Sequence, residues 1–412
     1  MLKFIFLLFS VFWLFWSNGK RKGWLTPSSW IYFIYVLCMI CAIPSLNIMG
    51  YKEPFMDKYW GPTILYIALL FLYIYPFKVF DENKSDKMVL PSKQILDLFS
   101  TFIIILSFFS LIFFIPSVNL IFAMSDLGQA RNDLYGGELY IEVGLSNTIA
   151  TVSASLYVFA IILFFIYLVL GNSKKRCILL LVSSLSEVIH VLAYVGRDGV
   201  VFWIFSFVFA FLTFRPYLDD IQIKKIKKYG IIGGALLMIP FLLISISRFS
   251  DSSAYDSTSS SLFGYMGMGP INGILYLGLD NPPCYYGIDF PLYFEITHTK
   301  PPVVISFNSI GDWKSWNFST FVAAFYSDFG LWGMIFVGLV LFILFVSLVC
   351  KRKTLHFSSL IIYTLYFQVF SQGVFYFRHY TRGGNLFIVL CFIMYIAFNA
   401  LEGSSKTVIV KK

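Results

Sequence analysis

The sequence predicts an all-α protein that crosses a membrane many times, and three observations lead to this prediction. The chain of 412 residues is 58% hydrophobic and only 13% charged, whereas about a quarter of the residues in a soluble domain are charged. Its mean hydropathy is +0.77. Apolar runs of about 20 residues recur along the whole length, as in membrane helices, and the short alternating segments of a membrane β-barrel are not the pattern. A soluble globular protein is therefore excluded.

We expect about eleven transmembrane helices, with one large loop after the eighth. They cover residues 3–17, 30–48, 62–80, 99–123, 147–170, 177–195, 199–214, 229–247, 329–350, 357–376 and 385–400. Residues 1–247 then hold eight helices and a smaller loop at about 125–147, residues 248–320 form the large loop, and residues 321–412 hold three helices and a tail. We interpret the first helix as a retained anchor, because no small-residue cleavage site follows it.

The basic residues predict which side of the membrane each loop faces. Of the 31 lysines and arginines, 21 fall on one set of short loops and the tail, and ten on the other side. By the positive-inside rule the first set is cytoplasmic, so the N-terminus lies outside and the C-terminus inside. The net charge of +9 is explained by this bias, and we predict no nucleic-acid partner.

The sequence lacks several common metal-binding, nucleotide-binding and catalytic motifs. There is no CxxC pair and no zinc-type spacing of His and Cys, so we predict no metal. There is no P-loop, GxGxxG, GxSxG or HExxH, so we also predict no cofactor. An enzyme of this kind would take a lipid-borne substrate from the membrane itself.

Arginine is rare on the predicted outer side, which makes the few arginines there candidates for binding phosphate. The planar guanidinium group forms two parallel hydrogen bonds with phosphate oxygens. These arginines are Arg131, Arg197, Arg248, Arg378 and Arg382. Arg197 stands out because its short turn, Gly196–Gly199, joins two apolar spans where a charge is costly. The alternatives are a simple Arg197–Asp198 turn, or a side chain that only extends to the interface.

The span before this turn carries Glu187, His190 and Tyr194, which with Arg197 would share one helix face. One interpretation is a buried Glu187–His190 pair that fixes helix packing, and the other is the floor of a polar cleft. In the outer turn between the last two spans, Arg378 and Arg382 are four residues apart.

The same outer turn and the segments near it offer further alternatives. The glycines after Arg382 would allow a ligand to approach the backbone closely, although interfacial anchoring would also explain the arginines. Asp133 could simply pair with Arg131. Asp328 could cap its helix or orient a nucleophile.

Taken in order, these motifs resemble the O-antigen polymerases (Wzy type) of bacterial surface-polysaccharide assembly. The residues that carry the resemblance are Ala130–Tyr135, Gly196–Gly199, Arg248 before the large loop, Tyr326–Gly330 with Gly333, and Arg378–Gly384. That family is similar in architecture to the O-antigen ligases and other glycosyltransferases of the GT-C type. The resemblance implies a multi-pass protein of the bacterial inner membrane with its active face in the periplasm.

The resemblance also implies a reaction. The substrates would be oligosaccharide repeat units carried on undecaprenyl pyrophosphate, and the growing glycan would be transferred to the next unit with release of the carrier. We expect Arg197, Arg248 and Arg378 to bind the departing pyrophosphate, with Arg382 and Arg131 as second choices. Candidates for a base are Asp198, Asp328 and His379. A chain-length regulator is an expected partner; an O-antigen ligase or a lipid-linked oligosaccharide flippase is the alternative function.

Overall fold

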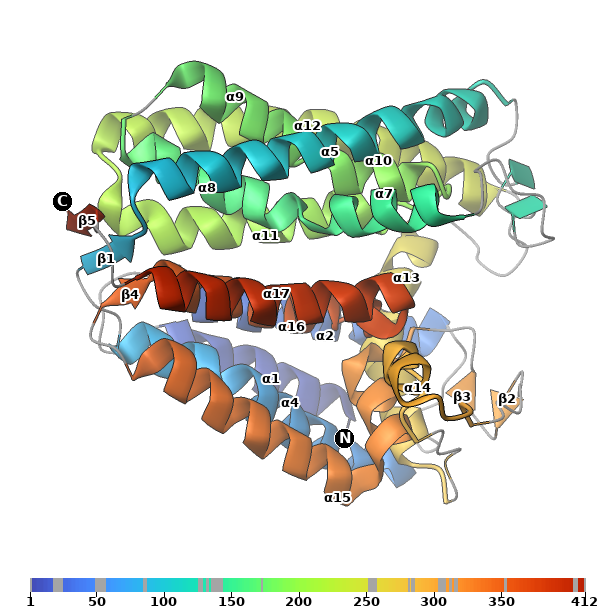
Figure 1. Ribbon diagram of the computed structural model, residues 1–412. Coiled ribbons are helices and arrows are strands. Elements are labelled where there is room, and N and C mark those ends of the chain that lie inside the picture. The colour runs from blue at the N-terminus through green and yellow to red at the C-terminus, as the bar shows by residue number, and fades with distance from the viewer. Residues whose placement is uncertain are drawn as a thin grey trace. The chain divides into compact units, whose positions relative to one another are not determined.

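The protein is described here from a computed structural model, which is almost entirely α-helical (Figure 1). It describes residues 2–17, 25–48, 57–83, 87–124, 129–130, 133–134, 144–171, 173–250, 258–280, 282, 286–302, 309–310, 313–314, 318–351, 354–402 and 407–410. The chain divides into two compact units. Unit 1 comprises Met1–Lys84, Tyr255–Lys353 and Leu365–Val389, and unit 2 comprises Ser85–Ala254, Thr354–Thr364 and Leu390–Lys412.

The all-α prediction is confirmed, and eight helical segments are long and apolar enough to cross a membrane. They are Pro27–Asn47, Asp57–Glu82, Lys93–Phe122, Leu145–Val169, Asp198–Tyr217, Asp220–Ser245, Thr320–Cys350 and Arg382–Leu401. The other three predicted spans are helical but shorter. Helices α1 (Leu2–Ser17) and α16 (Phe357–Gln372) have 16 residues each, and the span at 177–195 is broken into α9 (Lys174–Ser183) and α10 (Ser186–Leu192).

Unit 1 is built around helix α2 (Pro27–Ile48), which packs against α1, α4 (Trp60–Asn83) and α13 (Thr258–Leu277). Its remaining elements are η1 (Asp57–Tyr59), α14 (Pro291–Thr297), the two-stranded sheet β2 (Ser309–Ile310) and β3 (Trp313–Lys314), α15 (Thr320–Phe345), the π-helix η3 (Val346–Cys350) and η4 (Arg378–Tyr380). Buried tyrosines tie these helices together: Tyr35 donates to the Phe370 carbonyl at 2.5 Å, and Tyr73 to that of Met334 at 2.6 Å. Such bonds satisfy polar groups in a core without water.

Helix α13 lies within the range 248–320, which the sequence predicts to be a loop. It packs along α2 with its side chains buried from Ile271 to Leu277. The contact is close because Gly267 has no side chain: a Cβ there would lie 2.5 Å from the Ala42 Cα. Small residues let two membrane helices approach in this way. The region is therefore more structured than the sequence predicts, and α13 forms part of the core of unit 1.

Unit 2 contains the helices of the middle of the chain. They are α5 (Lys93–Phe122), α7 (Leu145–Ser155), α8 (Tyr157–Val169), α9, α10, α11 (Asp198–Phe214), η2 (Arg215–Tyr217) and α12 (Asp220–Ser250). Helix α8 is buried on nearly every side and packs against α9 and α11. Helices α16 and α17 (Arg382–Leu401) contribute residues to both units.

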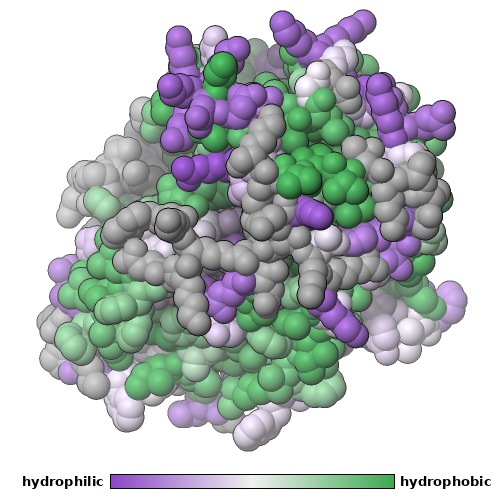
Figure 2. Space-filling model, turned by 90° about the vertical axis from the view of Figure 1, so that its left-hand side faces the viewer, coloured by the Kyte–Doolittle hydropathy of each residue, from purple (hydrophilic) through white to green (hydrophobic). Residues whose placement is uncertain are grey.

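A small sheet closes one end of unit 2. Strand β1 (Lys87–Leu90) pairs in parallel with β4 (Leu355–His356) and antiparallel with β5 (Thr407–Val410). The three strands come from segments that the charge bias places on one side of the membrane, so their pairing agrees with that assignment. Figure 2 is viewed from the side on which Figure 1 shows these strands, and hydrophilic side chains gather in the upper part of that view.

Candidate functional site

In unit 2, the turn Gly196–Gly199 is a tight connection between α10 and α11. Val195 has a positive φ of 53°, and the Gly196 amide donates to the Val191 carbonyl at 2.9 Å. A Cβ at Gly196 would lie 2.6 Å from the Val191 side chain, and one at Gly199 would lie 2.8 Å from it. Both glycines are therefore required by packing, and they bring the start of α11 close against α10.

This turn directs the Arg197 side chain to helix α12. Its Nη1 donates a 2.8 Å hydrogen bond to the Ser245 hydroxyl, whose own proton is donated to the Phe241 carbonyl at 2.7 Å. The guanidinium also lies over the Phe241 ring, 5.9 Å from its centre. Arg197 is only 2% exposed. The structure thus holds a buried guanidinium group in one orientation, where its fork can bind an anion with two oxygens.

Helix α12 between its lysine-rich end and Ser245 can be compared in length with a bilayer. Lys227 and Ser245 are 18 positions apart on this helix, which corresponds to about 27 Å at 1.5 Å per residue. The hydrocarbon core of a bilayer is about 30 Å thick. The stretch of α12 between its lysine-rich end and the Arg197–Ser245 pair is therefore about as long as that core is thick.

The prediction that Arg197 shares a helix face with Glu187 is wrong, because α10 ends at Leu192. The upstream polar residues form a group of their own: the His190 Nδ1 lies 3.3 Å from a carboxylate oxygen of the buried Glu187. Tyr194 packs edge-on against His190 and forms a 3.2 Å hydrogen bond with Asn147. This is the packing interpretation, in which the pair fixes α10 against α5 and α7.

The remaining predicted residues of unit 2 are less fully defined. Asp198 is half-buried in the first turn of α11, where the helix dipole favours a negative charge. Arg248 lies in the last turn of α12, and its side chain is outside the described part. Arg131 is also outside the described residues, and the Asp133 carboxylate accepts a 2.6 Å hydrogen bond from Gln129.

In unit 1, Asp328 lies where helix α15 changes direction. Two residues later, Gly330 has φ 64° and ψ 176°, a conformation that favours glycine, and it interrupts the helix. Asp328 is 2% exposed, and neither carboxylate oxygen has a hydrogen-bond partner among the described residues. A buried carboxylate that accepts no well-formed hydrogen bond is costly.

A second carboxylate, Asp289, lies beside it. It belongs to the loop before α14, and the backbone amides of Gly287, Ile288 and Asp289 face Asp328 without the geometry of full hydrogen bonds. Burial, and then the charge of Asp328, raises the pKa of Asp289 from 3.8 to about 7. Two neighbouring carboxyl groups with one of them neutral near pH 7 can hold and move a proton. The sequence does not reveal Asp289 as a site residue, because nothing local relates it to Asp328.

Asn385 connects this loop to His379. Its side-chain amide donates to the carbonyls of Asp289 at 3.1 Å and His379 at 2.6 Å, and its oxygen accepts from the Leu292 amide at 3.3 Å. A Cβ at Gly384 would lie 2.6 Å from the His379 Cα, so the glycine allows η4 to approach α17. The His379 ring is buried and stacks on Phe387 at 5.7 Å.

Arg378 and Arg382, in the segment between α16 and α17 and at the start of α17, differ in exposure. Arg382 is 62% exposed and pairs with Glu295 at 3.0 Å, a surface ion pair that contributes little to stability. Arg378 is half-buried in η4. Unit 1 thus assembles Asp328, His379, Arg378 and Arg382 around the loop before α14 and that helix, whereas Arg197, Asp198 and Arg248 belong to unit 2.

The described residues suggest no metal site, and the chain resembles no known protein in the comparisons made. Among the described residues there is no group of three or more His, Cys, Asp or Glu side chains that could hold a metal ion. The chain matches no protein-family model, no curated protein sequence and no solved structure.

Proposed function

We propose that the protein is a glycosyltransferase that polymerises lipid-linked oligosaccharide repeat units into a bacterial surface polysaccharide. The donor would be a glycan on undecaprenyl pyrophosphate, and the carrier would leave when the glycan is transferred to the next unit. The observation that carries this proposal is Arg197: a buried guanidinium group, oriented by Ser245, at one boundary of the membrane.

This arrangement suits a departing pyrophosphate. Negative charge grows on the pyrophosphate as the sugar–oxygen bond breaks, so a fixed cation stabilises the transition state more than the bound substrate. Arginine suits this role better than lysine, because its fork contacts two oxygens and it stays charged when buried. Ser245 orients the group without neutralising it. Arg248, in the last turn of α12, lies near enough along the helix to be a second candidate for this anion.

The acceptor hydroxyl of the next sugar needs a group that takes its proton. In unit 1, Asp328 is buried with three backbone amides facing it, and Asp289 beside it has a pKa of about 7. A base is most effective when its pKa is close to the working pH. We therefore assign proton transfer to the Asp289–Asp328 pair, and give His379, whose ring is enclosed by phenylalanines, a structural role.

We place this reaction at the periplasmic face of the inner membrane, in a GT-C-like protein with eleven spans, the N-terminus outside and the C-terminus in the cytoplasm. Two observations support this topology. Strands β1, β4 and β5 join three segments that are predicted to be cytoplasmic, and Asn385 joins two that are predicted to be outside.

The test is the surface-polysaccharide gel of a strain lacking the gene, compared with the same strain carrying it on a plasmid. A polymerase predicts that the ladder of long chains collapses to a band with a single repeat unit. Long chains stranded on the lipid carrier would instead indicate a ligase. Single units stranded on the cytoplasmic leaflet would indicate a flippase and overturn the proposal.

A further inference from the structure

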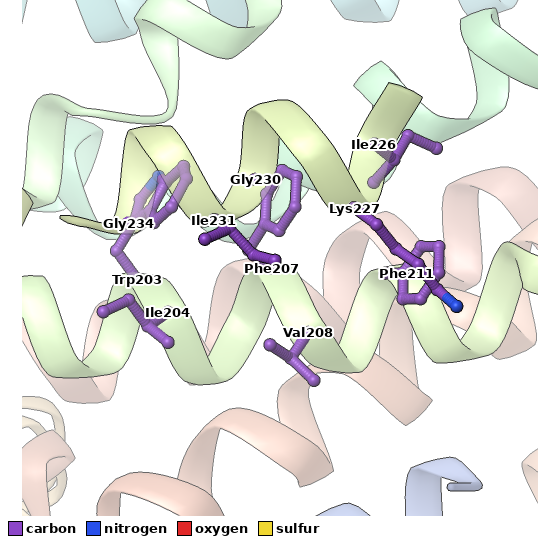
Figure 3. Close-up of a pocket in the computed structure, with 10 residues that line it drawn as sticks. All are labelled: Trp203, Ile204, Phe207, Val208, Phe211, Ile226, Lys227, Gly230, Ile231 and Gly234. Carbon is purple, nitrogen blue, oxygen red and sulfur yellow. The ribbon is translucent and has the colours of Figure 1, made fainter. Parts of the chain in front are cut away.

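An apolar groove runs between helices α11 and α12 of unit 2, at the end opposite Arg197. It encloses about 230 Å³, and aromatic side chains of α11, among them Trp203, Phe207 and Phe211, form one wall. The other wall belongs to α12, where Gly230 and Gly234 leave room because they have no side chains. Figure 3 shows Trp203 beside Gly234 at one end of the groove and Lys227 beside Phe211 at the other.

The groove faces outward from the unit. Its α12 wall continues into exposed apolar residues, with Ile231 74% exposed and Leu236 62% exposed. On a helix that crosses a membrane, such residues face lipid. The groove is therefore open to the hydrocarbon chains of the bilayer.

Charge distinguishes one end of the groove. Lys227 lines it, and Lys224, Lys225 and Lys228 lie on the same two turns of α12. Basic side chains between membrane helices on the cytoplasmic side attract anionic lipid head groups. An apolar slot with a cation at its mouth matches a molecule that has a hydrocarbon chain and a phosphate.

We infer that this groove binds an anionic phospholipid, with one acyl chain between α11 and α12 and its phosphate on Lys227. The site is distinct from the proposed reaction, because Lys227 and Ser245 lie about 27 Å apart along α12. A phospholipid is favoured over the polyprenyl carrier, because the head group would lie at the lysine-rich end and not at the end that holds Arg197.

Two pairs of variants of neighbouring residues test this inference. Gly234→Leu puts a side chain into the groove, and its Cβ meets no atom within 4 Å; the Cβ of Gly233→Leu is equally unhindered, but Gly233 does not line the groove. Lys227→Gln removes the cation at the mouth, and Lys228→Gln removes its neighbour, which lies 5.8 Å from the Tyr229 ring.

The measurement is native mass spectrometry of the full-length protein in detergent, titrated with phosphatidylglycerol or with phosphatidylcholine. We expect one phosphatidylglycerol to stay bound at concentrations where phosphatidylcholine does not. Lys227→Gln should weaken its binding about fivefold, which corresponds to about 1 kcal/mol for one cation near a head group. Gly234→Leu should abolish the tight site, and both control variants should bind as the wild type does.

Three results would overturn the inference. Equal retention of the two lipids would show that the charge plays no part. Equal effects of Gly233→Leu and Gly234→Leu would show that the groove is not the site. A wild-type dimer that Gly234→Leu dissociates would show that a helix from a second copy fills the groove, since small residues also serve helix pairing.

Discussion

Asn385 holds the backbone of Asp289 in place through a 3.1 Å hydrogen bond to its carbonyl, although 96 residues separate the two. The same amide binds the His379 carbonyl at 2.6 Å. One buried side chain thus joins the loop before α14 to the turn before α17. Because Asp289 lies beside Asp328, this amide also fixes the carboxylate pair.

Replacing Asn385 with alanine should therefore destabilise unit 1. Two carbonyls lose a donor and the Leu292 amide loses an acceptor, and each unsatisfied buried group costs about 1–3 kcal/mol. We expect a lower melting temperature for the detergent-solubilised protein. Asn399→Ala, an exposed position in the last turns of the same helix, is the control. Equal melting temperatures of the two variants would contradict the role given to Asn385.

The raised pKa of Asp289 predicts how stability depends on pH. Because the folded protein keeps this proton up to about pH 7 and the unfolded chain loses it near pH 3.8, the folded state binds more protons between these values. Stability should fall as the pH rises through this window and level off above it. Asp289→Asn should remove this contribution, whereas the exposed Asp280→Asn should keep it. Parallel melting-temperature profiles of the two variants would refute the assignment.

Gly330 should be intolerant of substitution because of its backbone conformation. Its φ of 64° and ψ of 176° would strain any other residue by about 1–3 kcal/mol, even though a Cβ there meets no neighbour. Gly330→Ala should lower the melting temperature and move Asp328. Gly61→Ala is the control: its Cβ is equally unhindered and its φ is ordinary, so it should stabilise the helix slightly. Identical effects would mean that the break in α15 is not strained.

Ser245→Ala should impair the proposed activity by releasing Arg197. The guanidinium loses the acceptor at 2.8 Å, and a hydrogen bond to a charged group contributes about 1.5–3 kcal/mol. We expect shorter polysaccharide chains at equal protein expression, and recovery with Ser245→Thr, which keeps the hydroxyl. Failure of threonine to restore chain length would indicate that position 245 acts through packing alone.

Long apolar helices could be predicted from the sequence because hydropathy accumulates along a span. Where polar residues or glycines interrupt the hydropathy of a segment, the sequence predicts its helices less well. Helix α13 is rich in glycine and polar residues, so its local pattern resembles a loop, yet one of these glycines, Gly267, allows it to pack closely on α2. The sequence also does not predict the break between α9 and α10. At the break, the Ser184 hydroxyl donates to the Leu181 carbonyl and accepts from the Trp203 indole at 3.0 Å.

The candidate site was predictable only in part. Arg197 attracts attention because a charge in a short turn between two apolar spans is costly, and Asp328 because it comes directly before a predicted span; neither argument needs a structure. Asp289, Asn385 and Ser245 are ordinary loop or helix residues in the sequence. Their importance depends on partners 39 to 96 positions away, which no local pattern reveals.

The most direct test compares Arg197→Lys with Arg215→Lys, the same exchange at the two ends of α11. Arg215 is exposed and lies on the lysine-rich side, so its replacement should leave the polysaccharide ladder unchanged. Arg197→Lys keeps the charge but loses the fork that the proposal requires. We predict that the ladder collapses to short chains at equal expression of the two proteins in the membrane. A full-length ladder with Arg197→Lys would contradict the claim that this guanidinium binds the departing pyrophosphate.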